Sequence, residues 1–185
     1  MVFKTNELIQ ELQDYVQSHI AYVTFLQSKS KEDLQSKRDD KTWSAIECIE
    51  HLNRYATFYN QEIRKRLSTS TTTKISVFKS GYWGNKFALD MLPKERMKKM
   101  KTFKSKNPIY SRLNTDKVVQ DFLELQEELL ELLESAKEKD LTNIKTAITL
   151  PILKFRLGDT FRFVIYHNER HIVQAKRALK GIKKV

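Results

Sequence analysis

Apolar and polar positions alternate along this chain with the period of amphipathic helices. In the segment 5–28 the apolar stripe comprises Leu8, Leu12, Tyr15, His19, Tyr22 and Leu26. Intervals of three and four place such residues on one face of a helix, and the same spacing predicts helices over 44–67, 114–139 and 159–180. Each helix must bury its apolar face against another. The pattern therefore predicts an all-α fold, a four-helix bundle formed by one domain over residues 1–185.

Short polar motifs mark where these helices begin. Ser44 and Glu47 have the spacing of a capping box, in which each side chain accepts a hydrogen bond from the other residue's backbone N–H group. Glu47 also lies one turn before His51, so an acid/base role, or a contact that orients a metal ligand, is the alternative. Asp159 is suited to the cap or the first turn of the last helix.

The segment 68–112 interrupts the helical pattern. It begins with a serine and threonine tract and then contains Gly81, Gly84, Pro93 and Pro108, so we expect a long irregular insertion between the second and third helices. Eleven basic and two acidic side chains give this segment +9 of the formal net charge of +11. Aromatic residues lie among the lysines, at Tyr82, Trp83, Phe87 and Phe103. The insertion could fold over the bundle, attract an anionic substrate, lie on an anionic membrane or contact nucleic acid, although no nucleic-acid-binding motif is present.

Composition fits an ordinary globular protein. The chain has 185 residues, of which 40% are hydrophobic and 31% charged, and it contains only four glycines and three prolines. Cys48 is the single cysteine, so no intramolecular disulfide can form. We find no signal peptide and no apolar run that reaches the roughly 18 residues of a membrane span. These features predict a cytoplasmic protein.

Two histidines in the last helical segment are the first candidates for a functional site. His167 and His171 are four residues apart, so both imidazoles leave the same helix face one turn apart and can point at one atom. Val164, Gln174 and Ala178 share that face, which should meet other helices. Buried neutral imidazoles need a partner, and a histidine pair at this spacing is a recurring way to hold a divalent metal ion.

A reactive metal site needs a third ligand. His51 is the best remaining candidate, because it shares a face of the second helix with Cys48, Tyr55 and Phe58. Three histidines from two helices would leave coordination positions for water or substrate. The alternative is that all three are core or boundary histidines. His19 lies on the apolar face of the first helix, where a hydrogen-bonded core role is the more common one.

These residues resemble a known family. Trp43 and Ser44 followed by Glu47, His51 and Leu52, and then His167, Arg170, His171 and Gln174 much later, are similar in order and spacing to the signature of the DinB superfamily of metal-dependent enzymes. The resemblance covers nearly the whole chain. It implies a four-helix bundle whose divalent metal, for example zinc, nickel or iron, would be held by His51, His167 and His171. Gln174 could contact a ligand or the substrate, and the alternative is a polar residue that ties helices together.

The resemblance implies a metal-dependent enzyme acting on a small molecule. Some family members activate a low-molecular-weight thiol for S-transfer or isomerisation, and hydrolysis is a related reaction that a metal ion can support. The alternative is a non-catalytic, stress-related binding protein whose basic insertion contacts nucleic acid or another partner. Family habit also suggests a homodimer.

Overall fold

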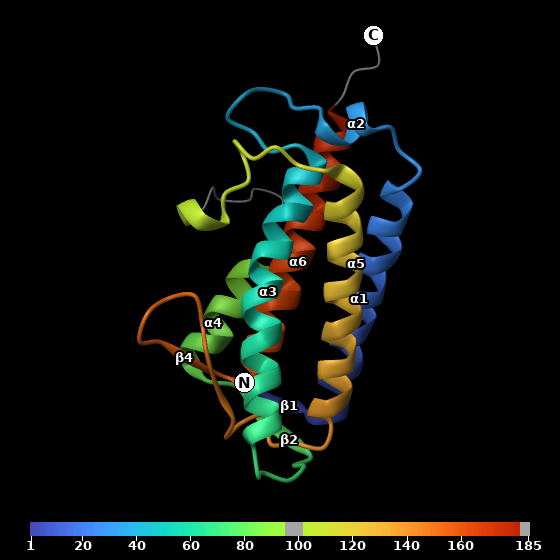
Figure 1. Ribbon diagram of the computed structural model, residues 1–185. Coiled ribbons are helices and arrows are strands. Elements are labelled where there is room, and N and C mark those ends of the chain that lie inside the picture. Colours follow the sequence, from blue (N-terminus) through green and yellow to red (C-terminus); the bar gives the residue numbers. More distant parts are fainter. Residues whose placement is uncertain (95–101, 182–185) are drawn as a thin grey trace.

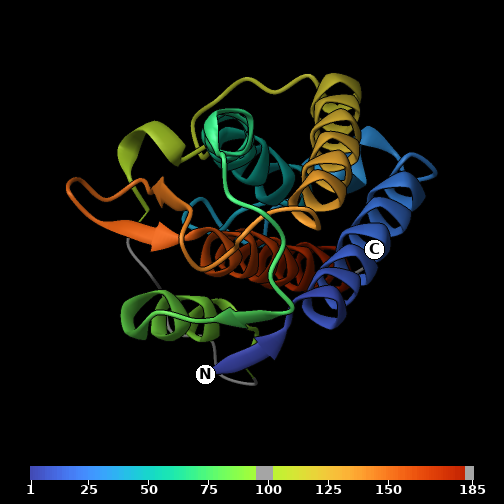
Figure 2. The ribbon, with the colours of Figure 1, turned by 90° about the horizontal axis from the view of Figure 1, so that it is seen from below.

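Four long helices form the body of the protein. A computed structural model describes residues 1–94 and 102–181, with the long helices α1 (Thr5–Leu26), α3 (Ala45–Thr69), α5 (Thr115–Ala136) and α6 (Leu157–Lys180) (Figure 1). Helix α3 contacts α5 and α6, and α1 contacts the same two helices, so the four surround a common core (Figure 2). The predicted all-α bundle is confirmed, and the predicted helix ends lie within about three residues of the observed ones.

The core consists of two hydrophobic clusters along the bundle. One contains Ile63 of α3 and Ile165 of α6, and the other contains Leu52 of α3 and Ile172 of α6. These residues recur at helical spacing and are almost fully buried. His167 lies between Ile165 and Ile172, so the two histidines of α6 are placed where the clusters meet.

Short elements lie at the ends and at the side of the bundle (Figure 1). Helix α2 (Lys31–Gln35) follows α1, and the strand β1 (Val2–Lys4) pairs antiparallel with β2 (Val77–Lys79). A second antiparallel pair, β3 (Lys145–Ala147) and β4 (Lys154–Arg156), leads into α6. Within residues 1–94 and 102–181, no helix combines the length and apolar character needed to cross a membrane.

The segment 68–112 is more regular than we expected. Besides β2 it contains helix α4 (Tyr82–Met91), which packs on α6, and the 3-10 helix η1 (Lys104–Lys106). Helix α4 begins at the glycine-containing stretch that we took as a sign of irregular structure, and Gly84, Ala88 and Met91 form its buried face. Four of the basic residues on which the charge argument depends, Arg96, Lys98, Lys99 and Lys101, lie outside the described residues.

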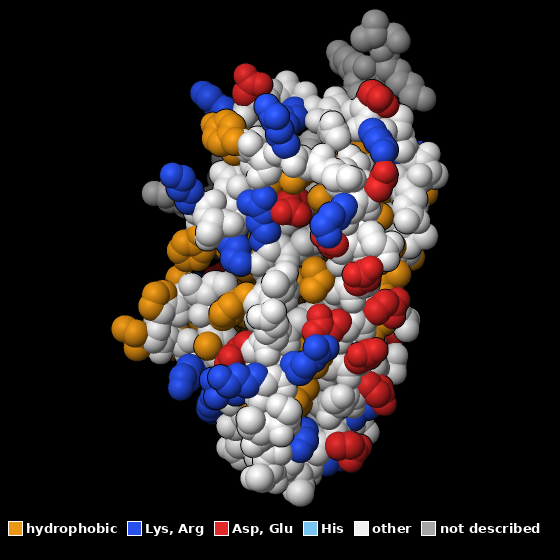
Figure 3. Space-filling view, viewed as in Figure 1, with side chains coloured by type: hydrophobic (Ala, Val, Ile, Leu, Met, Phe, Trp, Pro, Cys, Tyr) orange, Lys and Arg blue, Asp and Glu red, His pale blue; other side chains and the backbone are white. Residues whose placement is uncertain are grey.

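Acidic side chains follow the outer face of α5. Figure 3 shows them along this helix, and Glu124, Glu127, Glu131 and Glu134 are exposed. Its inner face carries Val118, Phe122 and Leu129, which are buried. The helix thus has the solvated outer face that its charge run predicts, and it supplies none of the three histidines of the candidate site.

A buried ionic network fixes α4 against α6. Asp159, in the first turn of α6, accepts hydrogen bonds from the Ser80 hydroxyl and from the backbone N–H of Gly81, the latter at 2.7 Å. Arg162, also almost fully buried, donates to Asp159 at 3.3 Å and to Asn85 of α4 at 3.0 Å. Because both charges are removed from water, their pairing and hydrogen bonds must offset a large desolvation cost. The start of α4 is therefore held in one position on α6.

We expect Gly84→Ala to destabilise the protein even though alanine is the better helix former. An added Cβ atom would meet the Asp159 side chain at 2.5 Å, and that side chain is fixed by its hydrogen bonds. The free energy of unfolding should fall by about 1–3 kcal/mol, as for other overpacked sites. Gly81→Ala is the matched control, because its nearest contact is 3.4 Å. Urea unfolding that finds the two variants equally stable would contradict this packing.

Candidate metal centre

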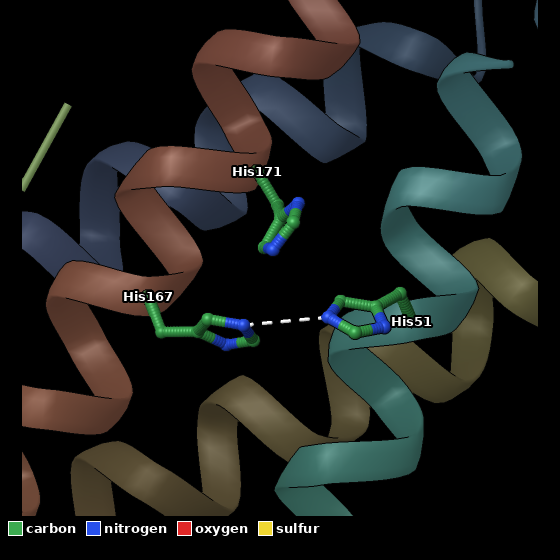
Figure 4. Close-up of side chains that lie close together, drawn as sticks. All are labelled: His51, His167 and His171. Atoms are coloured by element: carbon green, nitrogen blue, oxygen red, sulfur yellow. Dashed lines mark hydrogen bonds between the residues drawn. The ribbon is translucent and has the colours of Figure 1, made fainter. Parts of the chain in front are cut away.

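Three histidine side chains converge between α3 and α6. His51 comes from α3, while His167 and His171 come from α6, and their rings point toward one another (Figure 4). One ring nitrogen of each lies within 4.8 Å of the others, and the Nε2 atoms of His51 and His167 are 3.3 Å apart. The residues are only 2%, 8% and 9% exposed. The spacing of His167 and His171 thus brings them to a common point with His51.

The outer nitrogens of two rings are held by hydrogen bonds. His51 Nδ1 lies 2.7 Å from the carbonyl oxygen of Lys106, and His171 Nδ1 lies 2.9 Å from Oε1 of Gln174. A carbonyl oxygen can only accept, so in each pair the imidazole donates from Nδ1. The Nε2 lone pairs of both rings are therefore free to face the centre. Histidines that bind a metal ion usually donate their other ring N–H to an acceptor in this way.

The close contact between His51 and His167 is also compatible with a bound cation. Because His51 Nε2 has no proton in this tautomer, the 3.3 Å contact requires His167 to donate from its own Nε2. To bind a metal ion through Nε2, His167 would have to move that proton to its own Nδ1, after which the Nε2 lone pairs of both rings could face the ion. The donor set, three neutral imidazoles, suits zinc, nickel, iron or copper.

Burial keeps these rings neutral. It lowers the pKa of His51 to about 4 and that of His171 to about 3, and it lowers the pKa of His167 well below its ordinary value. Neighbouring positive charge acts in the same direction, from Arg54 and Lys106 on His51 and from Arg170 on His171. At neutral pH each ring thus keeps one nitrogen without a proton, and that nitrogen is available as a metal ligand.

Aromatic side chains surround the histidines. The centroid of the Trp43 ring lies 4.6 Å from that of the His51 ring. The centroid of the Tyr55 ring lies 4.9 Å from those of His51 and His167. Phe163 stacks on His167 at 6.2 Å. These walls limit the access of water to the ring nitrogens, which strengthens electrostatic interactions at the centre.

The other residues singled out in the sequence have structural contacts. Glu47 completes the capping box with Ser44, and its second oxygen accepts from Lys37 at 2.6 Å. His19 lies 2.9 Å from Glu169, away from the three-histidine group. Cys48 is fully buried, and burial raises the pKa of its thiol. Among these residues the predicted cap and the predicted core histidine are confirmed.

Sequence reasoning missed two features of the centre. From the sequence we gave Trp43 no role at the site, yet its ring centroid lies 4.6 Å from that of His51 and 5.7 Å from that of His171. The Lys106 carbonyl was not foreseen at all, because any residue type can present a backbone oxygen. Gln174 was foreseen, since its position one turn beyond His171 placed it on the histidine face.

The fold and the site define a class of protein: a helical bundle with a three-histidine group that could hold a metal ion. The chain belongs to the DinB superfamily, whose family model matches residues 14–175. That match contains all three histidines. No match was found among curated proteins or among solved structures.

We expect the metal-free protein to lose stability as pH falls from about 6.5 toward 4. In the unfolded chain His51 and His171 take up protons near the ordinary histidine pKa of about 6.5. In the folded protein the pKa is about 4 for His51 and about 3 for His171. The unfolded state then binds more protons, so acid favours it. Urea unfolding between pH 7 and pH 5, with chelator present, measures the effect. His51→Gln should make this decline shallower, and an unchanged slope would contradict the assigned neutrality of His51.

Proposed function

We propose that the protein binds one divalent metal ion through His51, His167 and His171. The observation that carries the proposal is the convergence of three ring nitrogens within 4.8 Å. The fixed Nδ1 atoms of His51 and His171 support it, because they leave Nε2 of each ring as the ligand atom. Zinc, nickel and iron are the candidate ions.

We further propose that the protein is a metal-dependent enzyme acting on a small molecule. A bound divalent ion supplies Lewis acidity, which makes a thiol or water nucleophilic at neutral pH. Three protein ligands leave coordination positions for a substrate. Thiol transfer, isomerisation and hydrolysis are the reactions that such a site supports, and a low-molecular-weight thiol is the substrate that membership of the DinB superfamily favours.

The residues around the histidines would select and shield that substrate. Trp43, Tyr55 and Phe163 offer apolar surface and keep water from the centre. Lys106 adds positive charge beside His51, whereas Arg54, the other nearby cation, is paired with Glu50 at 2.6 Å. An anionic group on the substrate would therefore be attracted to the site.

The alternative is a non-catalytic protein whose basic insertion binds nucleic acid or a protein partner. Within the described residues, part of this insertion packs on the bundle, through α4 on α6 and through the Lys106 carbonyl on His51. These contacts favour a role in building the metal site. Salt-dependent binding of DNA by the purified protein would support the alternative instead.

Metal content tests the ligand set directly. Protein loaded with zinc, then dialysed and analysed by elemental mass spectrometry, should retain about one ion per chain, as expected for one site with three histidine ligands. His51→Ala and His167→Ala should each retain far less, since two imidazoles hold zinc much more weakly than three. His19→Gln is the matched control, because it also removes a buried histidine. Equal metal content in all four proteins would refute the proposal.

Gln174→Ala should weaken zinc binding by about 10- to 100-fold, as expected when the partner of a ligand histidine is removed. The change takes away the acceptor of His171 Nδ1, so the ring loses its fixed orientation. A chelator competition assay measures the dissociation constant. Gln120→Ala, an exposed glutamine on α5, is the control. Identical affinity of the Gln174 variant and the unmodified protein would exclude this role.

The enzymatic part of the proposal has its own test. Zinc-loaded protein is incubated with a low-molecular-weight thiol and an electrophile, and consumption of the thiol is followed over time. His51→Ala should abolish the increase in rate over the uncatalysed reaction. Metal binding without such an increase, across zinc, nickel and iron, would retain the metal site and reject this thiol-transfer reaction.

A further inference from the structure

A short segment crosses α3 beside the three histidines. We call residues 102–111, which include η1, the strap. The Lys106 carbonyl in the strap accepts the hydrogen bond from His51 Nδ1 at 2.7 Å. The next residue, Asn107, accepts from Trp43 Nε1 through its side chain at 3.2 Å and from Arg54 Nη1 through its backbone carbonyl at 3.0 Å. Both donors come from residues close to His51 in the sequence.

Further contacts anchor the strap on either side of Asn107. Arg54 Nη2 donates to the Ser111 hydroxyl at 2.9 Å, and Lys37 donates to the Ile109 carbonyl at 3.3 Å. Lys106 Nζ in turn donates to the Arg54 carbonyl. Glu50 holds the Arg54 guanidinium at 2.6 Å, one turn along α3. The backbone around Lys106 is thereby fixed to the helix that carries His51.

Asn107 is the residue on which these contacts depend most. Its Oδ1 atom accepts from Trp43 Nε1 and also from the backbone N–H of Ile109, at 3.2 Å each. The second bond closes a local turn that directs the Asn107 carbonyl at Arg54. The first ties that turn to Trp43, whose ring packs on His51. The Asn107 side chain thus links the conformation of the strap to the His51 ring, which the strap orients.

The hydrogen bond from His51 has a definite chemical consequence. A neutral imidazole carries its proton on one nitrogen, and the Lys106 carbonyl, an acceptor only, keeps it on Nδ1. Without that carbonyl the proton could move to Nε2, the atom that faces His167. A ring in that second tautomer has to move this proton before it can bind a metal ion through Nε2, so its affinity for the ion is lower.

We propose that Asn107 is a positioning residue for the metal site: it holds the Lys106 carbonyl on His51 and so keeps His51 Nε2 available as a ligand. This inference rests on the proposed function for its effect on metal affinity. Its effect on the His51 tautomer is independent of any metal. Asn107 acts through the strap and does not itself touch the ligand nitrogens.

The test compares three variants that differ in what they remove. Asn107→Leu removes the acceptor at similar size, Asn107→Asp keeps an acceptor oxygen, and Tyr110→Ala alters a strap side chain that is 93% exposed. Nitrogen NMR of the metal-free proteins reads the tautomer of His51, and chelator competition gives the zinc dissociation constant.

We expect the unmodified protein, Asn107→Asp and Tyr110→Ala to keep the proton on Nδ1 and to bind zinc with dissociation constants within about threefold of one another. Asn107→Leu should show a mixture of tautomers and an affinity at least about tenfold lower, the effect expected for losing a contact that orients a ligand. An Asn107→Leu protein with the original tautomer and the original affinity would overturn the inference.

Two further results separate the possible failures. If the unmodified protein takes up no zinc, the proposed function fails, and the His51 tautomer in Asn107→Leu still decides whether the strap positions the ring. If Asn107→Leu does not fold, as judged by circular dichroism, Trp43→Phe removes the same hydrogen bond from the other side. That variant should show the same mixed tautomers, and a purely Nδ1-protonated His51 would then reject the inference.

Discussion

The structure depends on the burial of three neutral imidazoles between α3 and α6. Each ring is a polar group at the junction of two apolar clusters, where an unpaired nitrogen is costly. The protein meets this cost with a backbone carbonyl for His51 and an amide oxygen for His171. The inner nitrogens face one another, and a shared cation would satisfy all three at once.

Two segments outside the four long helices hold this arrangement in place. Helix α4 is fixed to the first turns of α6 through Asp159 and Arg162, one turn or more before His167. The strap is fixed to α3 through Arg54 and reaches His51. The two helices that supply the histidines are thus each supported from outside the bundle. Convergence of the rings therefore depends on the whole fold as well as on the spacing within one helix.

The sequence predicts the bundle and the three histidines because both depend on helical periodicity. The interval between His167 and His171 is a local property, and the apolar stripes determine which helix faces meet. Helix α4 was missed because Gly81 and Gly84 indicate a turn, while the close approach to Asp159 that Gly84 permits is a tertiary feature. The Lys106 carbonyl was missed because a backbone oxygen has no signature in the sequence. Prediction from the sequence alone thus found the three side chains that converge but not the group that orients His51.

His19 shows why burial on an apolar face does not define a metal ligand. Burial lowers its pKa, but Nε2 of His19 lies 2.9 Å from the Glu169 carboxylate, which raises that pKa in part. The carboxylate thus provides a hydrogen-bond partner for Nε2 of His19. For His51 and His171 the shifting charges are positive or come from another histidine. Their inner nitrogens face one another and no carboxylate, and this difference in neighbours, rather than in depth of burial, distinguishes the three converging histidines from His19.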